Sequence, residues 1–373
     1  MRVLMLGWFG DNENSGGMEV HIREICKNIA SENVPITLVV PKGANHIASG
    51  KYLRIVEIPC KRRAKTIESV IKNVSEFNKN IAKSFDRGFS FDIIHSHDWL
   101  SVAAAKKLKK KYNIPWIHTV HSLEHIRAAE ETRSRISEIE KDGIADSDKI
   151  ITVSNLMKKE IMKKHRIPAK KIEVIRNYLS AFSSEEFYPE SAARKKIVLF
   201  AGRLALQKGV ETLISAFSKV LCAHPDAKLI IAGDGSLKKS LVALAKIKGI
   251  EKAACFAGHV DEKTLESLYM QASVFVSPSV FEPFGITVLD AAYFGAPIIA
   301  TKNTGALEIF GKNSVVTVAP QNKNALAEKI IALLEDGAMR ASISDLAKKD
   351  VAFAENWKAL SEKTAREYRK LSD

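Results

Sequence analysis

The chain has few cysteines and no long apolar run. Its four cysteines, Cys26, Cys60, Cys222 and Cys255, show no CxxC spacing in 373 residues. Such a pattern is typical of buried free thiols rather than of disulfides or a cysteine-based metal site. No window approaches 18 uninterrupted apolar residues, and the start, MRVLMLGWFGD, is too short and too soon acidic for a signal peptide. The sequence therefore predicts a cytoplasmic protein.

Common nucleotide-binding and nucleic-acid-binding patterns are also missing. The chain has no GxGxxG fingerprint and no GxxxxGK[ST], which disfavours a classical dehydrogenase and an ATPase. The net charge is +14, and most of the positive excess lies in residues 1–180. Nucleic acid is nevertheless not supported as a partner, because the sequence shows no helix-turn-helix, no zinc finger and no strand rich in exposed aromatic residues. Basic runs such as Lys61–Lys65, Lys106–Lys111 and Lys158–Lys171 are ordinarily solvated faces. Alternatively, the basic runs bind an anionic membrane surface, which would give the protein a peripheral location at the membrane, or they bind an acidic acceptor.

The composition, 46% apolar and 27% charged, is that of a globular protein, and the length exceeds a single core of ordinary size. Short apolar runs alternate with amphipathic stretches, which predicts two doubly wound, Rossmann-like α/β domains whose carboxyl edges face a cleft. We expect a first domain over 1–180, a linker over 181–195, a second domain over 196–345 and a C-terminal helix over 346–373. The expected strands are Val3–Gly7, Ile36–Val40, Arg54–Ile58, Asp92–His95, Trp116–Val120, Ile150–Val153, Glu173–Ile175, Ile197–Ala201, Lys228–Ala232, Ala254–Ala257, Val274–Ser277, Pro297–Ala300 and Val315–Val318.

The most informative segment is FEPFGITVLD, residues 281–290. The Pro-Phe-Gly bend after Glu282 cannot continue a strand, and a plausible helix follows it. The backbone N–H groups of Gly285, Ile286 and Thr287, next to Phe284, would then face an anion with the helix dipole behind them. Carboxylates on either side of a phosphate site can accept hydrogen bonds from the hydroxyls of a sugar and a ribose. The alternative is that these acids only interact with the helix dipole, because acidic residues are common in first helical turns.

A second motif, GRLALQKG, follows the apolar run Ile197–Ala201. A strand, a short loop and a helix in this order place Arg203 and Lys208 at the carboxyl edge of a sheet, where open α/β folds bind ligands. Two fixed cations there would hold a diphosphate.

Together these motifs resemble those of the retaining glycosyltransferases of family 4, enzymes of the GT-B fold, over nearly the whole chain. The resemblance implies a metal-independent hexosyltransferase that uses a nucleotide-diphosphate sugar as co-substrate, without another cofactor, and a glycan or lipid-linked acceptor. It places Glu282 by the sugar and Arg203 and Lys208 on the diphosphate. The family motif ends in glutamate, whereas this chain has the shorter Asp290, whose predicted partner is the ribose. Retention in the family is commonly viewed as same-face attack without a covalent intermediate. The C-terminal part around Trp357 is expected to return to the first domain.

The resemblance also assigns residues in the first domain. A Gly-Gly pair, here Gly16 and Gly17 before a helix, touches the donor phosphate or sugar in family enzymes. The HSHDW segment with His97 and Asp98 resembles glycogen and starch synthases, and the segment TVH implies that His121 hydrogen-bonds the donor sugar as a neutral imidazole. Other segments depart from the family: Arg176, Asn177 and Tyr178 stand where relatives often have Pro-Asn-Gly, and Thr304–Gly305 stands before Glu308 in place of Gly-Gly.

Other interpretations are open. The histidines around His97 and His121 could hold zinc, but three imidazoles would have to converge without a Cys or Glu framework. Asp146 and Asp148 fit the Asp-x-Asp string of metal-dependent transferases, yet they precede a strand instead of following one. A GT-B relative with other chemistry, such as a nucleotide-sugar epimerase or a phosphorylase, or a catalytically silent nucleotide-sugar-binding protein, is the alternative to a glycosyltransferase.

Overall fold

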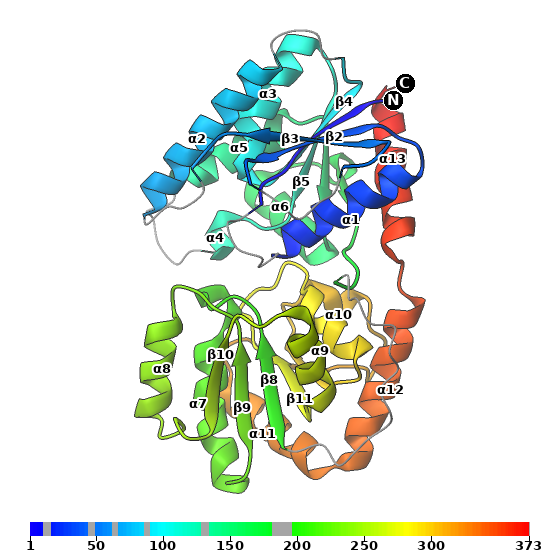
Figure 1. Ribbon diagram of the computed structural model, residues 1–373. Helices are drawn as coiled ribbons and strands as arrows, with labels where there is room; N and C mark the ends of the chain where they lie inside the picture. The colour runs from blue at the N-terminus through cyan, green and yellow to red at the C-terminus, as the bar shows by residue number, and fades with distance from the viewer. Residues whose placement is uncertain are drawn as a thin grey trace. The chain divides into compact units, whose positions relative to one another are not determined.

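The structure, a computed structural model, describes residues 1–9, 16–43, 49–61, 66–85, 90–127, 134–180 and 196–372. Its contacts divide the chain into two compact units (Figure 1). The first unit comprises Met1–Asn177 and Glu355–Asp373, and the second comprises Tyr178–Ala354. The linker expected over 181–195 lies outside the described residues.

The first unit is built on a parallel 7-stranded sheet with the order β3-β2-β1-β4-β5-β6-β7. Every strand expected here is present, with its ends shifted by no more than two residues. The strands are β1 (Val3–Leu6), β2 (Ile36–Pro41), β3 (Leu53–Ile58), β4 (Ile93–His97), β5 (Trp116–Val120), β6 (Lys149–Thr152) and β7 (Ile172–Val174). The central strands β1, β4 and β5 are buried throughout, because helices cover both faces of a parallel sheet.

The helices of the first unit pack in two groups. On one side α2, α3 and α5 pack together, and on the other α1 packs against α13 (Figure 1). Leu4, Ile94, Phe77 and Trp116 belong to the buried core between the sheet and the first group. The helices are α1 (Gly17–Ser31), α2 (Ile67–Ser84), α3 (Val102–Tyr112), α4 (Glu124–Arg127), α5 (Ser134–Asp146), α6 (Asn155–His165) and α13 (Trp357–Ser372).

The second unit repeats this architecture with a parallel 6-stranded sheet in the order β10-β9-β8-β11-β12-β13. The strands expected from the sequence are again present. They are β8 (Ile197–Ala201), β9 (Lys228–Ala232), β10 (Ala254–Gly258), β11 (Val274–Ser277), β12 (Ile298–Thr301) and β13 (Val316–Val318). The helices are α7 (Val210–Ala223), α8 (Lys238–Ile247), α9 (Glu262–Gln271), α10 (Ile286–Tyr293), α11 (Lys323–Glu335) and α12 (Gly337–Phe353).

The C-terminal stretch differs from the sequence expectation. The sequence predicts one C-terminal helix over 346–373, but the structure breaks the helical stretch between Phe353 and Trp357. The helix α12 belongs to the second unit, and the chain passes to the first unit at Glu355, close to Trp357, around which the return was expected. The separate helix α13 begins at Trp357, whose indole lies 5.9 Å from the ring of His21 on α1, centroid to centroid.

Each sheet has a point where its strand order reverses. In the first sheet this point lies between β1 and β4, and in the second it lies between β8 and β11. Helices that follow the two strands on either side of such a point diverge to opposite faces, which leaves space for a ligand at the carboxyl ends of those strands. Functional side chains are therefore expected at the ends of these four strands.

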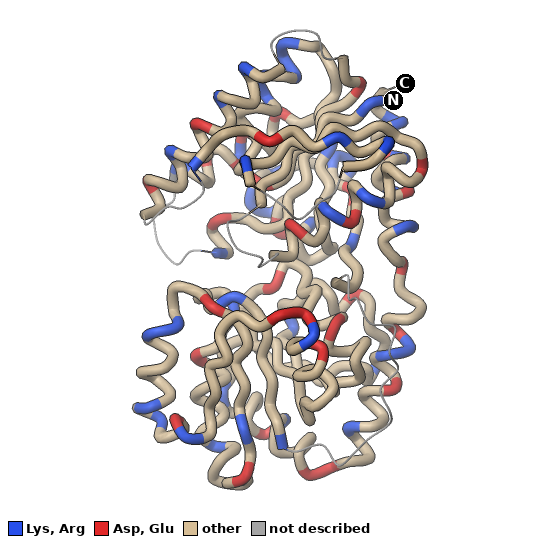
Figure 2. Tube along the Cα trace, in the orientation of Figure 1, with Lys and Arg blue, Asp and Glu red and all other residues tan. Residues whose placement is uncertain are grey.

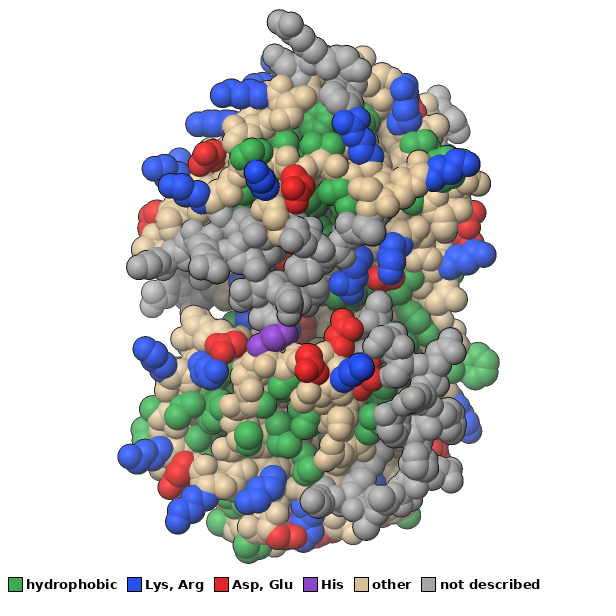
Figure 3. All heavy atoms as spheres, in the orientation of Figure 1, with side chains coloured by type: hydrophobic (Ala, Val, Ile, Leu, Met, Phe, Trp, Pro, Cys, Tyr) green, Lys and Arg blue, Asp and Glu red, His purple; other side chains and the backbone are tan. Residues whose placement is uncertain are grey.

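Basic side chains are spread over both units. Figure 2 shows many Lys and Arg positions in the α2–α3 region of the first unit, and Figure 3 shows them dispersed over the face in view, with other side chains between them. Some are neutralised locally, since Lys106 contacts Asp142 and Asp146 of α5. None of the described helices combines the length and the apolar character that a membrane crossing requires.

Candidate functional site

Two predicted motifs meet at the reversal point of the second sheet. Lys208 follows β8 and Glu282 follows β11. The Nζ atom of Lys208 donates to Oε2 of Glu282 at 2.6 Å, and their side chains are 20% and 10% exposed. The hydroxyl of Ser279 donates to the same oxygen at 3.0 Å. No described residue bonds to the other oxygen, Oε1, so it remains available to a ligand hydroxyl.

The backbone around Lys208 brings its loop against the segment that carries Glu282. Gly209 has φ +64, and a Cβ added there would lie only 2.1 Å from the carbonyl oxygen of Pro278. The amide of Val280 also donates to the carbonyl of Gln207 at 2.8 Å. Only a glycine fits at position 209, because its φ is positive and the neighbouring backbone is in the way.

The other side of Glu282 is fixed by the loop after β12. The amide of Glu282 donates to the carbonyl of Asn303 at 2.8 Å, and its own carbonyl accepts from the amide of Gly305 at 2.9 Å. Thr301 donates through its hydroxyl to the carbonyl of Ser279 at 2.6 Å. Glu282 is therefore positioned through its backbone as well as through its carboxylate.

Arg203 lies at the end of β8, as the sequence predicts, and its side chain is exposed. Its carbonyl accepts from the amide of Ala205 at 3.0 Å. Among the described residues no hydrogen bond or ion pair to its guanidinium is found. The group is thus able to turn toward an anion, although the structure does not bring it into contact with Lys208 or Glu282.

The helix expected after the Pro-Phe-Gly bend begins at Ile286. Its N-cap, Gly285, has φ +101 and provides no side-chain cap. The amides of Gly285, Ile286 and Thr287 are at the end of the helix where no intrahelical acceptor exists, so they form a possible anion site. Phe284 is buried, and its carbonyl accepts from the amide of Ala306 at 2.7 Å.

Asp290 is buried, whereas a residue that contacts a ligand is expected to be accessible. Its side chain is 1% exposed, and its two oxygens accept from the amide and the hydroxyl of Ser180 at 3.0 and 2.9 Å. Burial raises the pKa of this carboxyl to about 7, against the opposing effect of the two Ser180 hydrogen bonds. A ribose diol could bind this carboxylate only after the Ser180 contacts open, and the predicted ribose contact stays a prediction.

The first sheet presents the remaining predicted residues at its own reversal point. Gly16 is the N-cap of α1, without a side-chain cap, and Gly17 is the first residue of that helix. The helix thus begins with bare backbone, as the sequence predicts. His97 ends β4, next to Thr119 of β5.

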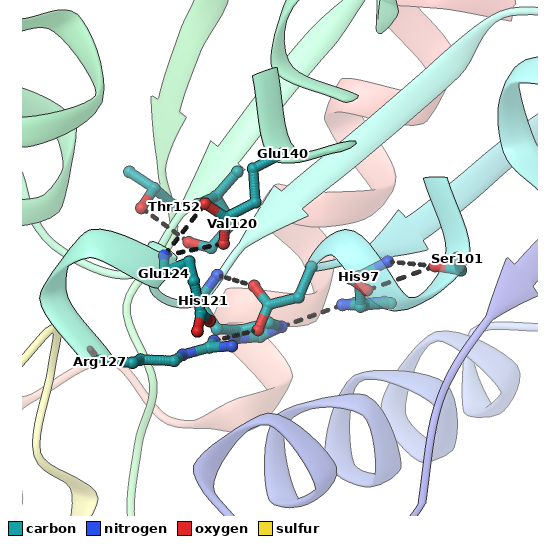
Figure 4. A network of polar contacts seen from close by, with 9 residues as sticks. His97, Ser101, Val120, His121, Glu124, Arg127, Glu140 and Thr152 are labelled. Atoms are coloured by element: carbon teal, nitrogen blue, oxygen red, sulfur yellow. Dashed lines mark hydrogen bonds and ion pairs between the residues drawn. The ribbon is translucent and has the colours of Figure 1, made fainter. Parts of the chain in front are cut away.

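Asp98 holds the backbone of His121 in place. Its Oδ1 atom accepts from the amide of His121 at 2.8 Å, and its Oδ2 atom accepts from the guanidinium of Arg127 at 2.6 Å (Figure 4). Asp98 has φ +48, which is uncommon for a residue other than glycine. These contacts hold Asp98 against the backbone of His121, and the expectation that Asp98 binds substrate stays a prediction.

Glu140 of α5 accepts hydrogen bonds from the first residue of α4. Its two oxygens accept from the amide of Glu124 at 2.9 and 3.0 Å (Figure 4). Burial is the largest effect on this carboxyl and raises its pKa to about 8, against the amide of Glu124 and the charge of Arg127. Glu140 thus fixes the start of the short helix that carries Arg127.

His121 is part of a cluster of buried histidines. The Nδ1 atom of His97 and the Nε2 atom of His121 are 3.1 Å apart, with their rings stacked (Figure 4). His21 of α1 packs edge-on against His121, with ring centroids 4.7 Å apart, and its Nδ1 atom is 2.7 Å from Oδ1 of Asn177. Burial lowers the pKa of all three imidazoles, to about 4 for His21, so they are neutral at neutral pH.

The other histidines near these strands have their own partners. His95 contacts the hydroxyls of Tyr368 and Thr119, both at 2.6 Å. His118 is 2.8 Å from the hydroxyl of Ser96, and His125 is 2.9 Å from Glu160. Of these three, His95 also stacks on His97, with their ring centroids 4.4 Å apart.

Both carboxylates of the Asp-x-Asp pair contact lysines in the structure. Asp146 is paired with Lys106 and Asp148 with Lys109, both at 2.7 Å. The second oxygen of Asp148 accepts from the amide of Trp116 at 2.8 Å. Both carboxylates therefore have cationic partners within the first unit.

Three residues at these sites were missed by the sequence analysis. His21 lies on the apolar stripe of α1, four residues before Ile25, and a histidine on such a stripe was a signal that could have been used. Ser279 carried no signal, and Asn177 was named only as part of a segment that departs from the family, because its contact with His21 joins residues distant in sequence.

Family models match both halves of the chain. The model described as "Glycosyltransferase Family 4" matches residues 15–179, and the one described as "Glycosyl transferases group 1" matches residues 183–350.

Curated relatives carry related names. An uncharacterized glycosyltransferase of Methanocaldococcus jannaschii is 34% identical over 75% of this chain and 75% of its own length. The glycogen synthase of Mycobacterium tuberculosis is 31% identical over 76% of this chain and 70% of its own. A D-inositol 3-phosphate glycosyltransferase of Corynebacterium urealyticum is 26% identical over 96% of this chain and 91% of its own.

Solved structures share the fold. Sucrose-phosphate synthase from Thermosynechococcus elongatus has a TM-score of 0.84 at 23% identity, covering 99% of this chain and 98% of its own. HepE of Anabaena in complex with UDP-glucose has a TM-score of 0.75 at 16% identity, with full coverage of both chains.

Proposed function

The chain belongs to the glycosyltransferases of family 4, the group 1 glycosyl transferases with the GT-B fold, and on that premise we propose that it is a retaining hexosyltransferase. It transfers a sugar from a nucleotide-diphosphate sugar to a hydroxyl of a glycan or lipid-linked acceptor, and it needs no metal ion for this step.

The observation that carries the proposal is the contact between Lys208 and Glu282 at the reversal point of the second sheet. It joins a cation suited to a phosphate with a carboxylate suited to a hydroxyl, at the edge where open α/β folds bind their ligands. A nucleotide-sugar needs both groups within a few ångströms, because its diphosphate is bonded directly to its sugar.

The proposed mechanism follows the movement of charge. When the bond from the sugar to the diphosphate breaks, negative charge grows on the departing diphosphate. Lys208, Arg203 and the free amides at the start of α10 then bind the transition state more strongly than the ground state. The charges of Lys208 and Arg203, with the amide dipoles, replace the positive charge that a metal ion supplies in other transferases.

Glu282 is assigned to the sugar rather than to nucleophilic attack. Its Oε2 atom is already occupied by Lys208 and Ser279, which leaves Oε1 to accept from a sugar hydroxyl. Retention is then achieved by attack of the acceptor on the face that the diphosphate leaves, without a covalent intermediate.

In the first unit, His121 is assigned to a hydroxyl of the donor sugar. Burial holds its pKa well below the usual value, with the neighbouring His21 and Arg127 adding to this effect. The imidazole therefore binds as a neutral hydrogen-bonding group and places no extra positive charge beside the developing oxocarbenium ion.

The donor base, the sugar and the acceptor are to be identified by experiment. The purified protein would be screened against nucleotide sugars by thermal shift, beginning with UDP-glucose, with which the HepE structure was solved. Donors that stabilise the protein would then be incubated with glycan, inositol phosphate and lipid-linked acceptors, and the anomeric configuration of each product read by NMR. Transfer with inverted configuration, or sugar epimerisation without acceptor, would overturn the proposal.

We also propose that the basic first unit can associate with an anionic membrane that presents a lipid-linked acceptor. The excess of positive charge in residues 1–180 supports this. Co-sedimentation with vesicles containing anionic lipid, compared with neutral vesicles, tests it; equal binding to both would contradict it.

A further inference from the structure

Three histidines from distant parts of the first unit converge on one another. His21 comes from α1, His97 from the end of β4 and His121 from the segment after β5. Their ring centroids are 4.7 Å (His21–His121), 5.3 Å (His97–His121) and 5.7 Å (His21–His97) apart. Each ring has one nitrogen that lies within 4.8 Å of a nitrogen on each of the other two rings.

These imidazoles are in the protonation state that a metal ion requires. All three are buried, and burial lowers the pKa of each below its usual value. A neutral imidazole keeps a lone pair on one ring nitrogen, whereas an imidazolium has none to give. At neutral pH the cluster therefore needs to lose no proton before it binds a cation.

A neighbouring side chain sets the orientation of His21. The Oδ1 atom of Asn177 lies 2.7 Å from Nδ1 of His21, and an amide oxygen can only accept, so the ring proton is on Nδ1. The lone pair of His21 is therefore on Nε2. Metal-binding histidines are commonly held in this way, with one ring nitrogen donating to an oxygen and the other binding the metal.

His97 and His121 are not satisfied by the protein. Among the described residues, Nε2 of His97 and Nδ1 of His121 have no hydrogen-bond partner although both atoms are buried. The neighbouring His95 differs, because both of its ring nitrogens have partners. These are not the two nitrogens that face each other at 3.1 Å, so each of these rings has a second, buried nitrogen without a partner, which is uncommon in proteins.

We propose that His21, His97 and His121 form a binding site for Zn²⁺ or a similar divalent transition-metal ion. Three imidazoles with a fourth position open to a ligand are a common zinc environment, and nitrogen donors favour such ions over Mg²⁺. With Zn–N bonds of about 2.0–2.1 Å, tetrahedral ligand nitrogens lie about 3.3–3.4 Å apart. The Nδ1 atom of His97 and the Nε2 atom of His121 are 3.1 Å apart, and the nitrogens of the set lie within 4.8 Å of one another, so the widest pair would have to close by up to about 1.4 Å.

The bound ion would inhibit transfer, a consequence that rests on the proposed function. His121 would give its lone pair to the metal and could no longer accept from a hydroxyl of the donor sugar. Zn²⁺ is thus expected to oppose donor binding, with no part in the transfer itself.

The test uses the full-length protein, freed of metal with EDTA and then desalted. Titration with Co²⁺ should produce the intense visible absorption bands of a tetrahedral ion at one equivalent per chain, and Zn²⁺ should displace it. His21→Ala should weaken binding at least about tenfold, the size of effect expected when a ligand or its support is lost. His259→Ala, which removes an exposed histidine of the second unit, should leave binding unchanged.

If His21→Ala does not fold, as judged by circular dichroism, His21→Gln replaces it in the titration. Weak bands typical of octahedral Co²⁺ in the wild-type protein, or equal affinity of the wild type and a folded His21 variant, would overturn the site. Isothermal titration of the donor with and without Zn²⁺ measures the expected competition. Unchanged donor affinity in saturating Zn²⁺ would overturn the inhibition, whereas absence of transfer by the metal-free enzyme would count only against the proposed function.

Discussion

The ammonium group of Lys208 and the carboxylate of Glu282 form a 2.6 Å ion pair between residues 74 positions apart in the sequence. The pair lies where the order of the second sheet reverses and is only partly exposed. In such a place each partner offsets the cost of removing the other from water. Binding of the donor does not have to break the pair, because the ammonium group has three protons and only one is used by Glu282.

Lys208→Ala and Glu282→Ala should each lower kcat by about two orders of magnitude or more. Removal of a preorganised charge partner typically raises the transition-state barrier by about 3 kcal/mol. Initial rates at saturating donor and acceptor measure the effect, and circular dichroism checks the fold. Lys238→Ala is the matched control, because it removes a lysine from the exposed pair with Asp234. Near-normal rates in either site variant would contradict the assignment.

Ser279→Ala should lower kcat/KM about tenfold, since a hydrogen bond to a charged group contributes about 1.5–3 kcal/mol and Lys208 still holds the same oxygen. Ser240→Ala, an exposed serine of α8, is the control. To distinguish positioning of Glu282 from a general effect on stability, Ser279→Ala is also measured in the Glu282→Gln variant. There Ser279→Ala should have much less effect, and a full tenfold loss in both backgrounds would mean that Ser279 acts through the fold alone.

Most of the fold could be predicted from the sequence. Parallel strands buried on both faces are continuous apolar runs, so Ile197–Ala201 and Trp116–Val120 were predicted at their observed ends. The break between α12 and α13 was not predicted, because the helical pattern continues on both sides of it. Local helical periodicity does not reveal that the chain passes from one unit to the other at Glu355.

The candidate site could be predicted in part. The strand–loop–helix order placed Lys208 and Glu282 at one sheet edge, and the structure brings their side chains together. The burial of Asp290 beneath Ser180 was beyond the sequence, since the motif spacing gives the position on the helix but not what covers it. The convergence of His21 on His97 and His121 was likewise hidden, because it depends on how α1 packs.

Transfer should persist in excess EDTA, because in the proposed mechanism Arg203 and Lys208 supply the positive charge for the departing diphosphate. Asp146→Asn and Asp148→Asn should leave the rate nearly unchanged, since both carboxylates are exposed partners of lysines. Rates measured with EDTA and with added Mg²⁺ or Mn²⁺ check this. A strict requirement for an added divalent ion would contradict the metal-independent mechanism and restore the Asp-x-Asp interpretation.

Asp290→Asn should stabilise the second unit increasingly as the pH rises from about 4 to 7. The folded pKa of Asp290, about 7, is above its ordinary value of 3.8, so the folded protein binds more protons in this range and loses stability as the pH rises. Asparagine stays neutral and can keep both contacts with Ser180. At about 1.4 kcal/mol per pKa unit, the free energy of unfolding of the variant should exceed that of the wild type by about 4 kcal/mol above pH 7. Denaturation monitored by circular dichroism measures it; a pH-independent difference would show that the carboxyl is not buried as described.

The first unit should show the opposite pH dependence. Burial lowers the folded pKa of His21 to about 4 and of His118 to about 3, below the ordinary 6.5. Stability from these neutral imidazoles is therefore present above about pH 6.5 and is lost as the pH falls toward the folded values. For His21 alone the loss is on the order of 3 kcal/mol.

Tryptophan fluorescence can isolate this effect. All four tryptophans, Trp8, Trp99, Trp116 and Trp357, belong to the first unit, so fluorescence reports its unfolding while circular dichroism reports both units. Between pH 6.5 and 4 the denaturation midpoint seen by fluorescence should fall. In His21→Gln the slope should be smaller, because one buried imidazole no longer takes up a proton on unfolding. A fluorescence midpoint that is constant over this range would mean that the histidines titrate normally in the folded protein.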